Sequence, residues 1–323
     1  MNEKIIPFLL FITILILFVF TNSKILSITH DSALYLVEIV NYEAPFHPHH
    51  LIYHKISELW LKLISSFSHI DTMFGVSFLN SIFGAGGIVV FYKILKDKFD
   101  INRSNALWFS LLPLFSFGYW LYSVSVEVYI MPIFFILAGF YYLISPKNNK
   151  EIYLGVSLLS ISVLFHQVHF ILVLPLLSYL IFGLKLQIKK ILQLSVVFFG
   201  IFGISYLLVL FFVEERFSID EILYWLTYYN HTVPSWNETN AVGIFKVFVG
   251  IIRSVISVYP VMASDLTIDF VNKIFGHKSL EEERYLFHNF SNIFLNFYFP
   301  LVFALFIDTI QKKKKNINIK KIS

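Results

Sequence analysis

The sequence contains no cysteine, few charged residues and only a small excess of positive charge. Because cysteine is absent, disulfide frameworks, thiolate nucleophiles and cysteine-ligated zinc are excluded. Only 14% of the residues are charged, too few to cover a soluble globule with polar surface. The net charge is +4, and much of the basic surplus lies in the stretch 311–321, so no nucleic-acid partner is expected.

Apolar residues dominate what remains. Hydrophobic residues make up 57% of the 323 residues, and the mean hydropathy is +0.71. A helix needs about 20 apolar residues to cross the hydrocarbon core of a bilayer. Uncharged windows of about this length occur at 5–23, 72–92, 104–126, 128–146, 191–213 and 285–307. The sequence therefore predicts an all-α, multi-pass membrane protein, in a cell or inner membrane, or in the endoplasmic reticulum of a eukaryote.

Short basic clusters predict which ends of these helices face the cytoplasm. Lysine and arginine favour cytoplasmic loops, and they gather at 93–103, 147–150 and 185–190. An even number of crossings must separate any two of these loops. The stretch 152–184 is therefore predicted to form two short helices that turn near 165–169.

The number of crossings depends on the window 241–263. It carries Lys246 and Arg253 seven residues apart, hence on one helical face, which favours an interfacial or partly re-entrant helix. The prediction is then about eight crossings with both termini inside. Nine crossings are the alternative, and would place the basic tail 312–323 outside. The first window, 5–23, lacks a signal-peptide cleavage pattern, so we expect a retained helix.

This topology places several polar segments on the external side. The first is the loop 24–71, which carries Asp31 near its start and an amphipathic stretch, 51–67, near its end. Apolar residues recur there at helical spacing, and Lys55, Glu58 and Lys62 are expected elsewhere on the surface. We predict that this helix lies along the membrane surface, with or without a role in substrate binding.

The other external candidates are histidines, one carboxylate and one arginine. Glu127 interrupts two apolar windows, and a carboxylate at membrane depth is costly unless it is paired or hydrated. A purely interfacial carboxylate is the alternative. His166 and His169 are expected one turn apart on one helical face, either as binding residues or as packing residues. Arg216 follows the window 191–213.

The histidines of the first loop, His47, His49 and His50, allow two kinds of chemistry. Imidazole is a common ligand of divalent metals. However, a His-x-His-His sequence on a turn that contains proline is not an established zinc spacing. Hydrogen bonding to a substrate phosphate, or bracing of the loop, is the preferred interpretation, and no metal or other cofactor is predicted.

These landmarks resemble one subfamily of the GT-C glycosyltransferases that is related to protein O-mannosyltransferases. Its first external loop has an Asp-Ser-Gly-Glu element and then His-Pro-Pro-Gly-x-Pro-Leu-Tyr, where this chain has Asp31-Ser32-Ala33-Leu34 and then 47–53, His-Pro-His-His-Leu-Ile-Tyr. A Glu-Val-Tyr element and a histidine element follow in the subfamily. Here Glu127-Val128-Tyr129 and the stretch 166–169 stand in the same order.

The resemblance implies an enzyme that moves a sugar from a polyprenyl-phosphate donor to a hydroxyl acceptor on the external face, with inversion at the sugar. Asp31 would be the general base, and Glu127 would assist it. The donor phosphate would be bound by polar and cationic side chains. The residues implied for the phosphate are His47, His49, Arg216, Lys246 or Arg253. His166, like Glu127, would position the acceptor or orient Asp31. The other substrate-binding residues implied are His50, Tyr53 and His169.

The chain also departs from the subfamily, at Leu34 in place of an acidic residue and at His49 and His50 in place of Pro-Gly. The resemblance covers residues 5 to 185. We expect a catalytic membrane module over 1–213 and then a segment 214–311 that carries the last helix. A transporter or flippase-like carrier of lipid-linked glycans is the rival interpretation, but it favours internal repeats, and the Asp31 to Tyr53 pattern is not repeated.

Overall fold

A computed structural model of the chain describes residues 5–22, 30–41, 46–114 and 116–227, together with the isolated positions 251, 269 and 273. Over these residues the protein is helical and contains no β-strand, so the predicted all-α class is confirmed for this part of the chain. The predictions for 285–307, for the tail 312–323, for Lys246 and Arg253, and for all of 241–263 except position 251 lie outside the described residues.

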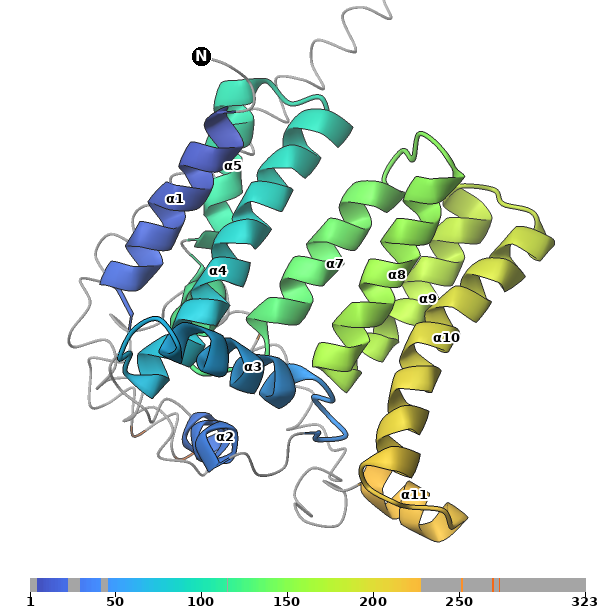
Figure 1. The fold of residues 1–323 in the computed structure, drawn as a ribbon. Helices are drawn as coiled ribbons and strands as arrows, with labels where there is room; N and C mark the ends of the chain where they lie inside the picture. The colour runs from blue at the N-terminus through green and yellow to red at the C-terminus, as the bar shows by residue number, and fades with distance from the viewer. Residues whose placement is uncertain are drawn as a thin grey trace, which may run out of the picture.

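The helices follow one another along the chain in the order shown in Figure 1. Their bounds are α1 Ile5–Phe20, α2 His30–Asn41, α3 Tyr53–Ser65, α4 Thr72–Lys93, η1 Ile94–Lys98, α5 Arg103–Leu114, α6 Phe117–Val124, α7 Ile130–Leu143, α8 Asn149–Phe165, η2 Gln167–Leu172, α9 Val173–Ser178, η3 Tyr179–Gly183, α10 Ile188–Phe212 and α11 Ile219–Leu226.

Several helix starts follow from capping residues in the sequence. The Asp71 side chain accepts a hydrogen bond from the Phe74 backbone N–H at the start of α4, and Asn148 accepts one from Glu151 at the start of α8. Ser218 and Glu221 form a reciprocal capping box at α11. Such side chains satisfy backbone donors that a helix leaves without partners in its first turn.

Two helical segments are long and apolar enough to cross a membrane, namely Thr72–Lys98 and Ile188–Phe212. A third crossing is possible if the bent pair α5 and α6 counts as one span. Among the described residues, these are the segments that meet the length and composition test. A helical protein with membrane-length segments is therefore established, whereas the number of eight crossings stays a prediction.

The window 104–126, expected to be one regular crossing, is broken. The chain forms α5 and α6, whose axes differ in direction by 71°. Pro113 lies in the last turn of α5 and has no N–H to continue the helical hydrogen bonds. The Pro113 carbonyl instead accepts hydrogen bonds from the N–H and the hydroxyl of Ser116, at 3.0 and 2.7 Å. The helix axis therefore changes direction near Pro113 and Ser116, while α5 and α6 together can still form one bent span.

The predicted turn in the stretch 152–184 is confirmed. Helix α8 ends at Phe165, His166 has an extended backbone, and a second helical run, η2 to η3, extends from Gln167 to Gly183. Helix α8 packs against both α7 and α10. Gly139 and Gly155 allow α7 and α8 to approach closely, because a Cβ on Gly155 would lie 2.9 Å from the Gly139 carbonyl oxygen.

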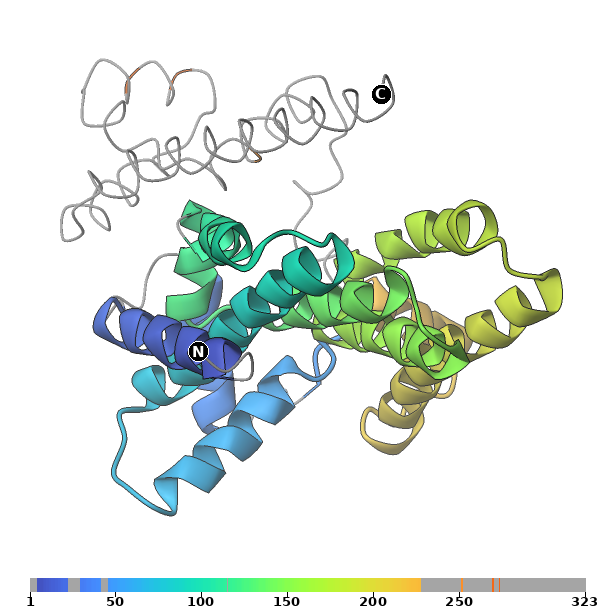
Figure 2. The same ribbon diagram turned by 90° about the horizontal axis from the view of Figure 1, so that it is seen from above.

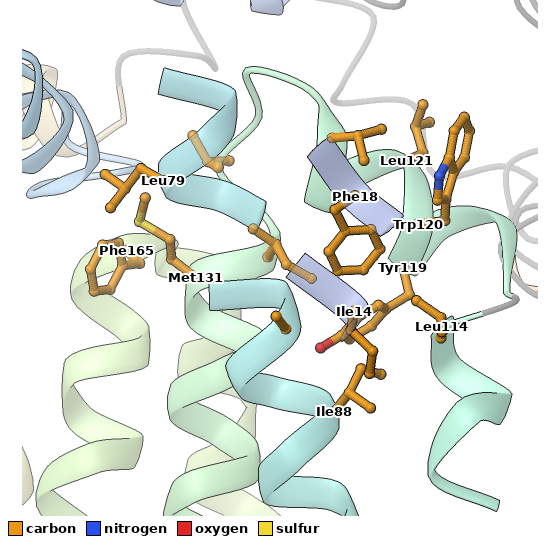
Figure 3. Close-up of a cluster of buried hydrophobic side chains, with 14 of the residues drawn as sticks. Ile14, Phe18, Leu79, Ile88, Leu114, Tyr119, Trp120, Leu121, Met131 and Phe165 are labelled. Atoms are coloured by element: carbon orange, nitrogen blue, oxygen red, sulfur yellow. The ribbon is translucent and has the colours of Figure 1, made fainter. Parts of the chain in front are cut away.

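The largest apolar core surrounds α4, which packs against α1, α5, α6 and α7. Ile14 and Phe18 of α1 lie beside Ile88 of α4 and Tyr119 of α6 (Figure 3). Met131 of α7 and Phe165 at the end of α8 belong to the same core. Since α4 lies at the centre of this packing, its polar residues can reach several elements at once.

The connections at the two ends of the bundle differ in character. The loops from α4 to α5, from α7 to α8 and from α9 to α10 lie at one end (Figure 1) and contain the basic clusters 93–103, 147–150 and 185–190. Helices α2, α3 and α11 lie at the opposite end. Figures 1 and 2 together show that α3 runs across the bundle rather than along it.

The separation of the basic loops from α2, α3 and α11 allows the predicted topology to be tested at both ends of the bundle. In the cysteine-free chain, single cysteines introduced near residues 45, 167 and 230 should react with a membrane-impermeant reagent added outside. Those near 98, 148, 188 and 315 should react only after the membrane is opened, because positively charged loops stay in the cytoplasm. External labelling near 315, with the other sites as expected, would replace eight crossings with nine.

Candidate active site at one end of the bundle

Glu127 and the start of α2 meet at the end of the bundle that carries α2 and α3. Glu127 lies between α6 and α7 and is only 2% exposed. The Ser32 hydroxyl, which is also buried, donates a hydrogen bond of 2.9 Å to Glu127 Oε1. Asp31 is the preceding residue and is exposed. Two landmarks that are 95 residues apart in the sequence are therefore in direct contact.

Asn80 of α4 holds the non-helical stretch that carries Glu127. Its side-chain N–H₂ donates to the carbonyl oxygens of Ser125 and Glu127, at 2.7 and 2.8 Å, and to the Tyr53 hydroxyl at 3.4 Å. Backbone groups outside a helix need such partners where water is excluded. Sequence reasoning missed Asn80, which is fully buried, although an asparagine inside the apolar window 72–92 was a signal that could have identified it.

Six histidine rings form a continuous group beside this contact. This histidine cluster comprises His47, His49, His50, His54, His166 and His169. His50 is at its centre, with ring centroids 5.0 Å from His47, 5.2 Å from His166 and 6.1 Å from His54. His49 lies 5.6 Å from His47, and His169 lies 5.8 Å from His166. The first-loop histidines and the later histidine element, predicted separately, are brought together.

Backbone and side-chain hydrogen bonds fix the first loop against the ends of α8 and α10. The Gln167 N–H donates to the His49 carbonyl at 2.9 Å, and the Ile52 N–H donates to the Leu164 carbonyl at 3.2 Å. From α10, the buried Tyr206 hydroxyl donates to the Pro48 carbonyl at 2.6 Å. These contacts span the loop from 48 to 52, so the cluster is built on a braced segment.

Tyrosines surround the cluster. The Tyr35 hydroxyl lies 3.0 Å from His50 Nε2, within hydrogen-bonding distance. The Tyr129 ring stacks on His166 with centroids 5.2 Å apart, which joins the Glu-Val-Tyr element to the histidine element. Tyr53 is fully buried, and burial raises the pKa of its hydroxyl. Tyr53 therefore acts as a neutral hydrogen-bonding group.

Burial keeps the first-loop histidines uncharged. It lowers the pKa of His47 to about 3 and that of His49 to about 4. The pKa of His50 is also lowered, first by burial and then by the neighbouring histidines. Removing a cation from water disfavours its charged form. At neutral pH these side chains are therefore imidazoles rather than imidazolium ions.

A carboxylate on α2 was also missed by sequence reasoning. Glu38 Oε2 lies 3.3 Å from Nε2 of His54, whose side chain is 1% exposed. Asp31, Tyr35 and Glu38 follow one another at intervals of four and three residues, so they share one face of α2. Because residues at this spacing lie on the same face of a helix as Asp31, the sequence could have identified Tyr35 and Glu38 as candidate site residues.

Helix α3 corrects one prediction about its polar side chains. Glu58, expected on the outer surface, is 4% exposed and receives hydrogen bonds from Lys55 and Lys62. These bonds lower the pKa of the Glu58 carboxyl. Leu59 and Leu63, in contrast, are 55% and 53% exposed. The helix thus turns Glu58 toward the bundle and these two leucines outward, whereas Lys55 and Lys62 stay partly exposed.

Arg216 lies at the same end of the bundle, after α10, but its guanidinium pairs with Glu214 at 3.4 Å. Within the described ranges, no three or more histidine, aspartate or glutamate side chains are arranged so that they could hold a metal ion. What the site offers is three carboxylates, Asp31, Glu38 and Glu127, of which the first is exposed and the last is buried. They lie beside a group of neutral hydrogen-bond donors and acceptors.

Comparison with known proteins adds no assignment: no protein-family model, no curated protein and no solved structure matches the chain.

Proposed function

We propose that the protein is a membrane glycosyltransferase that transfers a sugar from a polyprenyl-phosphate donor to a hydroxyl acceptor outside the cytoplasm. The proposal is supported by one observation above all. Ser32 contacts Glu127, Tyr129 stacks on His166, and His166 contacts His50. All the landmarks of the resemblance to GT-C enzymes thus belong to one contiguous site. Loops that share no function are not expected to bring such residues together.

Asp31 is the proposed general base. It is exposed at the start of α2, where an acceptor hydroxyl could reach it. The carboxylate would take the proton of that hydroxyl while the oxygen attacks the anomeric carbon and the lipid phosphate leaves from the opposite side. One attack of this kind inverts the configuration. Glu127, buried and hydrogen-bonded to the neighbouring Ser32, would hold the start of α2 in place.

The histidine cluster is the proposed site for the donor phosphate. Tyr53, His54 and Tyr35 surround His50, so hydrogen-bond donors converge where negative charge would develop on the leaving group. The exposed leucines of α3 would lie at the bilayer surface, the depth at which the phosphate of a membrane-anchored lipid is found. Arg216 remains a proposed cation for the same phosphate.

Reconstitution tests this function. The full-length chain in lipid vesicles would be given polyprenyl-phosphate sugars and a mixture of hydroxyl acceptors, and products would be identified by mass spectrometry. Glycans lost when the gene is deleted would show which sugar and which acceptor to use. A transported lipid-linked glycan that crosses the bilayer without any new glycosidic bond would favour the carrier interpretation instead.

Activity is expected to survive metal chelation. The His-x-His-His spacing matches no established zinc motif, so the histidines are assigned to phosphate binding. Transfer measured with a strong chelator present should remain within about twofold of the untreated rate, because no step depends on a Lewis acid. Loss of activity that a single divalent ion restores would instead make His47, His49 and His50 metal ligands.

A further inference from the structure

The site proposed for the donor phosphate has an unusual charge composition. Glu38 and Glu127 are acidic, and three cations at this end of the bundle already pair with other carboxylates. Lys55 and Lys62 bind Glu58, and Arg216 binds Glu214. A buried phosphate needs a nearby positive charge as well as hydrogen bonds. Among the described residues of this site, the groups that can supply one by changing their own state are the histidines.

His50 is the histidine best placed to do so. It is 3% exposed and contacts the rings of His47, His54 and His166. Its Nε2 faces the Tyr35 hydroxyl at 3.0 Å, whereas its Nδ1 is buried and has no hydrogen-bond partner. A buried polar atom without a partner is costly, and it marks a position where a ligand atom would restore the missing bond.

The ionisation of His50 depends on every element packed around it. Helix α2 presents Tyr35 and Glu38, and α3 presents Tyr53 and His54. The end of α8 presents His166. Three of the surrounding groups have contacts with residues other than His50: Glu38 contacts His54, Tyr129 stacks on His166, and Glu127 accepts a hydrogen bond from Ser32. Burial, first of all, and the neighbouring histidines oppose an imidazolium. Without a ligand, His50 is therefore neutral.

We propose that the donor phosphate is bound together with a proton, which His50 takes from solvent, so that the phosphate is held by a buried imidazolium. Protonated His50 would donate from Nε2 to the Tyr35 oxygen and from Nδ1 to a phosphate oxygen. This inference rests on the proposed function for the class of ligand. It adds that donor binding depends on pH and that departure of the lipid phosphate would release the proton.

The sign of the pH dependence follows from linkage. Burial lowers the pKa of free His50 below its ordinary value, and an adjacent phosphate raises it in the complex. Between these two pKa values, binding takes up a proton, so the Kd rises with pH by up to about tenfold per unit for one proton. Binding should therefore be tightest at the acidic end of the range from about pH 5 to about pH 8.

The experiment uses the full-length protein in lipid nanodiscs and a polyprenyl methyl phosphate, a phosphodiester whose charge does not change over this range. Titration calorimetry in two buffers of different ionisation enthalpy gives the Kd and the number of protons taken up. We expect uptake approaching one proton, and much weaker binding of the uncharged polyprenol. A Kd that is constant with pH, or equal binding of both lipids, would refute the proposal.

Variants separate His50 from other titrating groups. His50→Gln cannot become a cation and should lose both the proton uptake and the pH dependence. His69→Gln, an exposed histidine between α3 and α4, is the matched control and should behave like the parent. If His50→Gln does not insert, Tyr35→Phe, which removes the partner of Nε2, should still reduce the uptake. An unchanged uptake in the inserted variant would exclude His50.

Sugar transfer is measured separately, so the two proposals can fail independently. Proton-coupled binding without any transfer would retain the phosphate site and reject the enzyme. Transfer with binding that does not depend on pH would retain the enzyme and reject the role of His50.

Discussion

Asp31→Asn should leave a normally inserted protein with almost no glycosylated product. The asparagine has the size and hydrogen-bonding capacity of the aspartate, but it cannot accept the proton of the acceptor hydroxyl. Removing a general base costs about 10² to 10⁴ in rate. Because Asp31 is exposed at the start of α2, its structural contribution should be below about 0.5 kcal/mol. The initial rate of transfer in vesicles, normalised to inserted protein, measures the effect.

A second exposed carboxylate at the same end of the molecule provides the control. Asp220 lies in the first turn of α11 and is exposed. Asp220→Asn should therefore transfer sugar at a rate close to that of the parent. If Asp31→Asn retains more than about a tenth of the parent rate, above the loss that a general base requires, the role proposed for Asp31 is incorrect.

Glu127→Gln is expected to reduce transfer by about tenfold to hundredfold, less than Asp31→Asn. The amide has nearly the same shape and can still accept the hydrogen bond from Ser32, but it lacks the charge that makes this bond strong. A small displacement of a reacting group can cost as much as about 10² in rate. If Glu127 only positions α2, kcat should fall while the KM for the donor stays nearly constant.

Ser32→Ala tests whether Glu127 acts through its contact with α2. Combined with Glu127→Gln in a double-mutant cycle, it should give a coupling energy of about 0.5 to 3 kcal/mol for transfer, as found for residues in direct contact. Ser32→Ala alone should lower kcat without changing insertion. Additive effects in the double variant would mean that the 2.9 Å hydrogen bond is not how Glu127 contributes.

Much of the order of the helices could be predicted from residue types alone. Long uncharged windows gave the positions of α4 and α10, and the spacing of basic clusters required the turn near 165–169 that the structure has at His166. The same reasoning did not predict the 71° bend within 104–126, because a hydropathy window does not register that Pro113, near the end of α5, has no backbone N–H. Composition predicts where a helix can form more reliably than where it must stop.

The site was predictable as a set of candidates but not as an arrangement. Asp31, Glu127 and the histidines drew attention because polar residues are costly in an apolar chain. The sequence pattern did not indicate how these residues lie relative to one another in space. Asn80 and Tyr206, which brace the Glu127 stretch and the first loop, lie in helices whose sequences are mostly apolar. Each makes its contact with a residue far along the chain, and local periodicity carries no information on such pairs.

The sequence by itself determined that this is a helical protein with membrane-length apolar segments, because composition and the length of uncharged runs depend on residues that are neighbours in the chain. It also determined which residue types were available for chemistry. Only the tertiary structure decided that Ser32 contacts Glu127, that His50 is surrounded by other histidines, and that Glu58 is turned inward. These outcomes depend on how α2, α3, α4 and α8 pack together, and packing is a property of the whole assembly of helices.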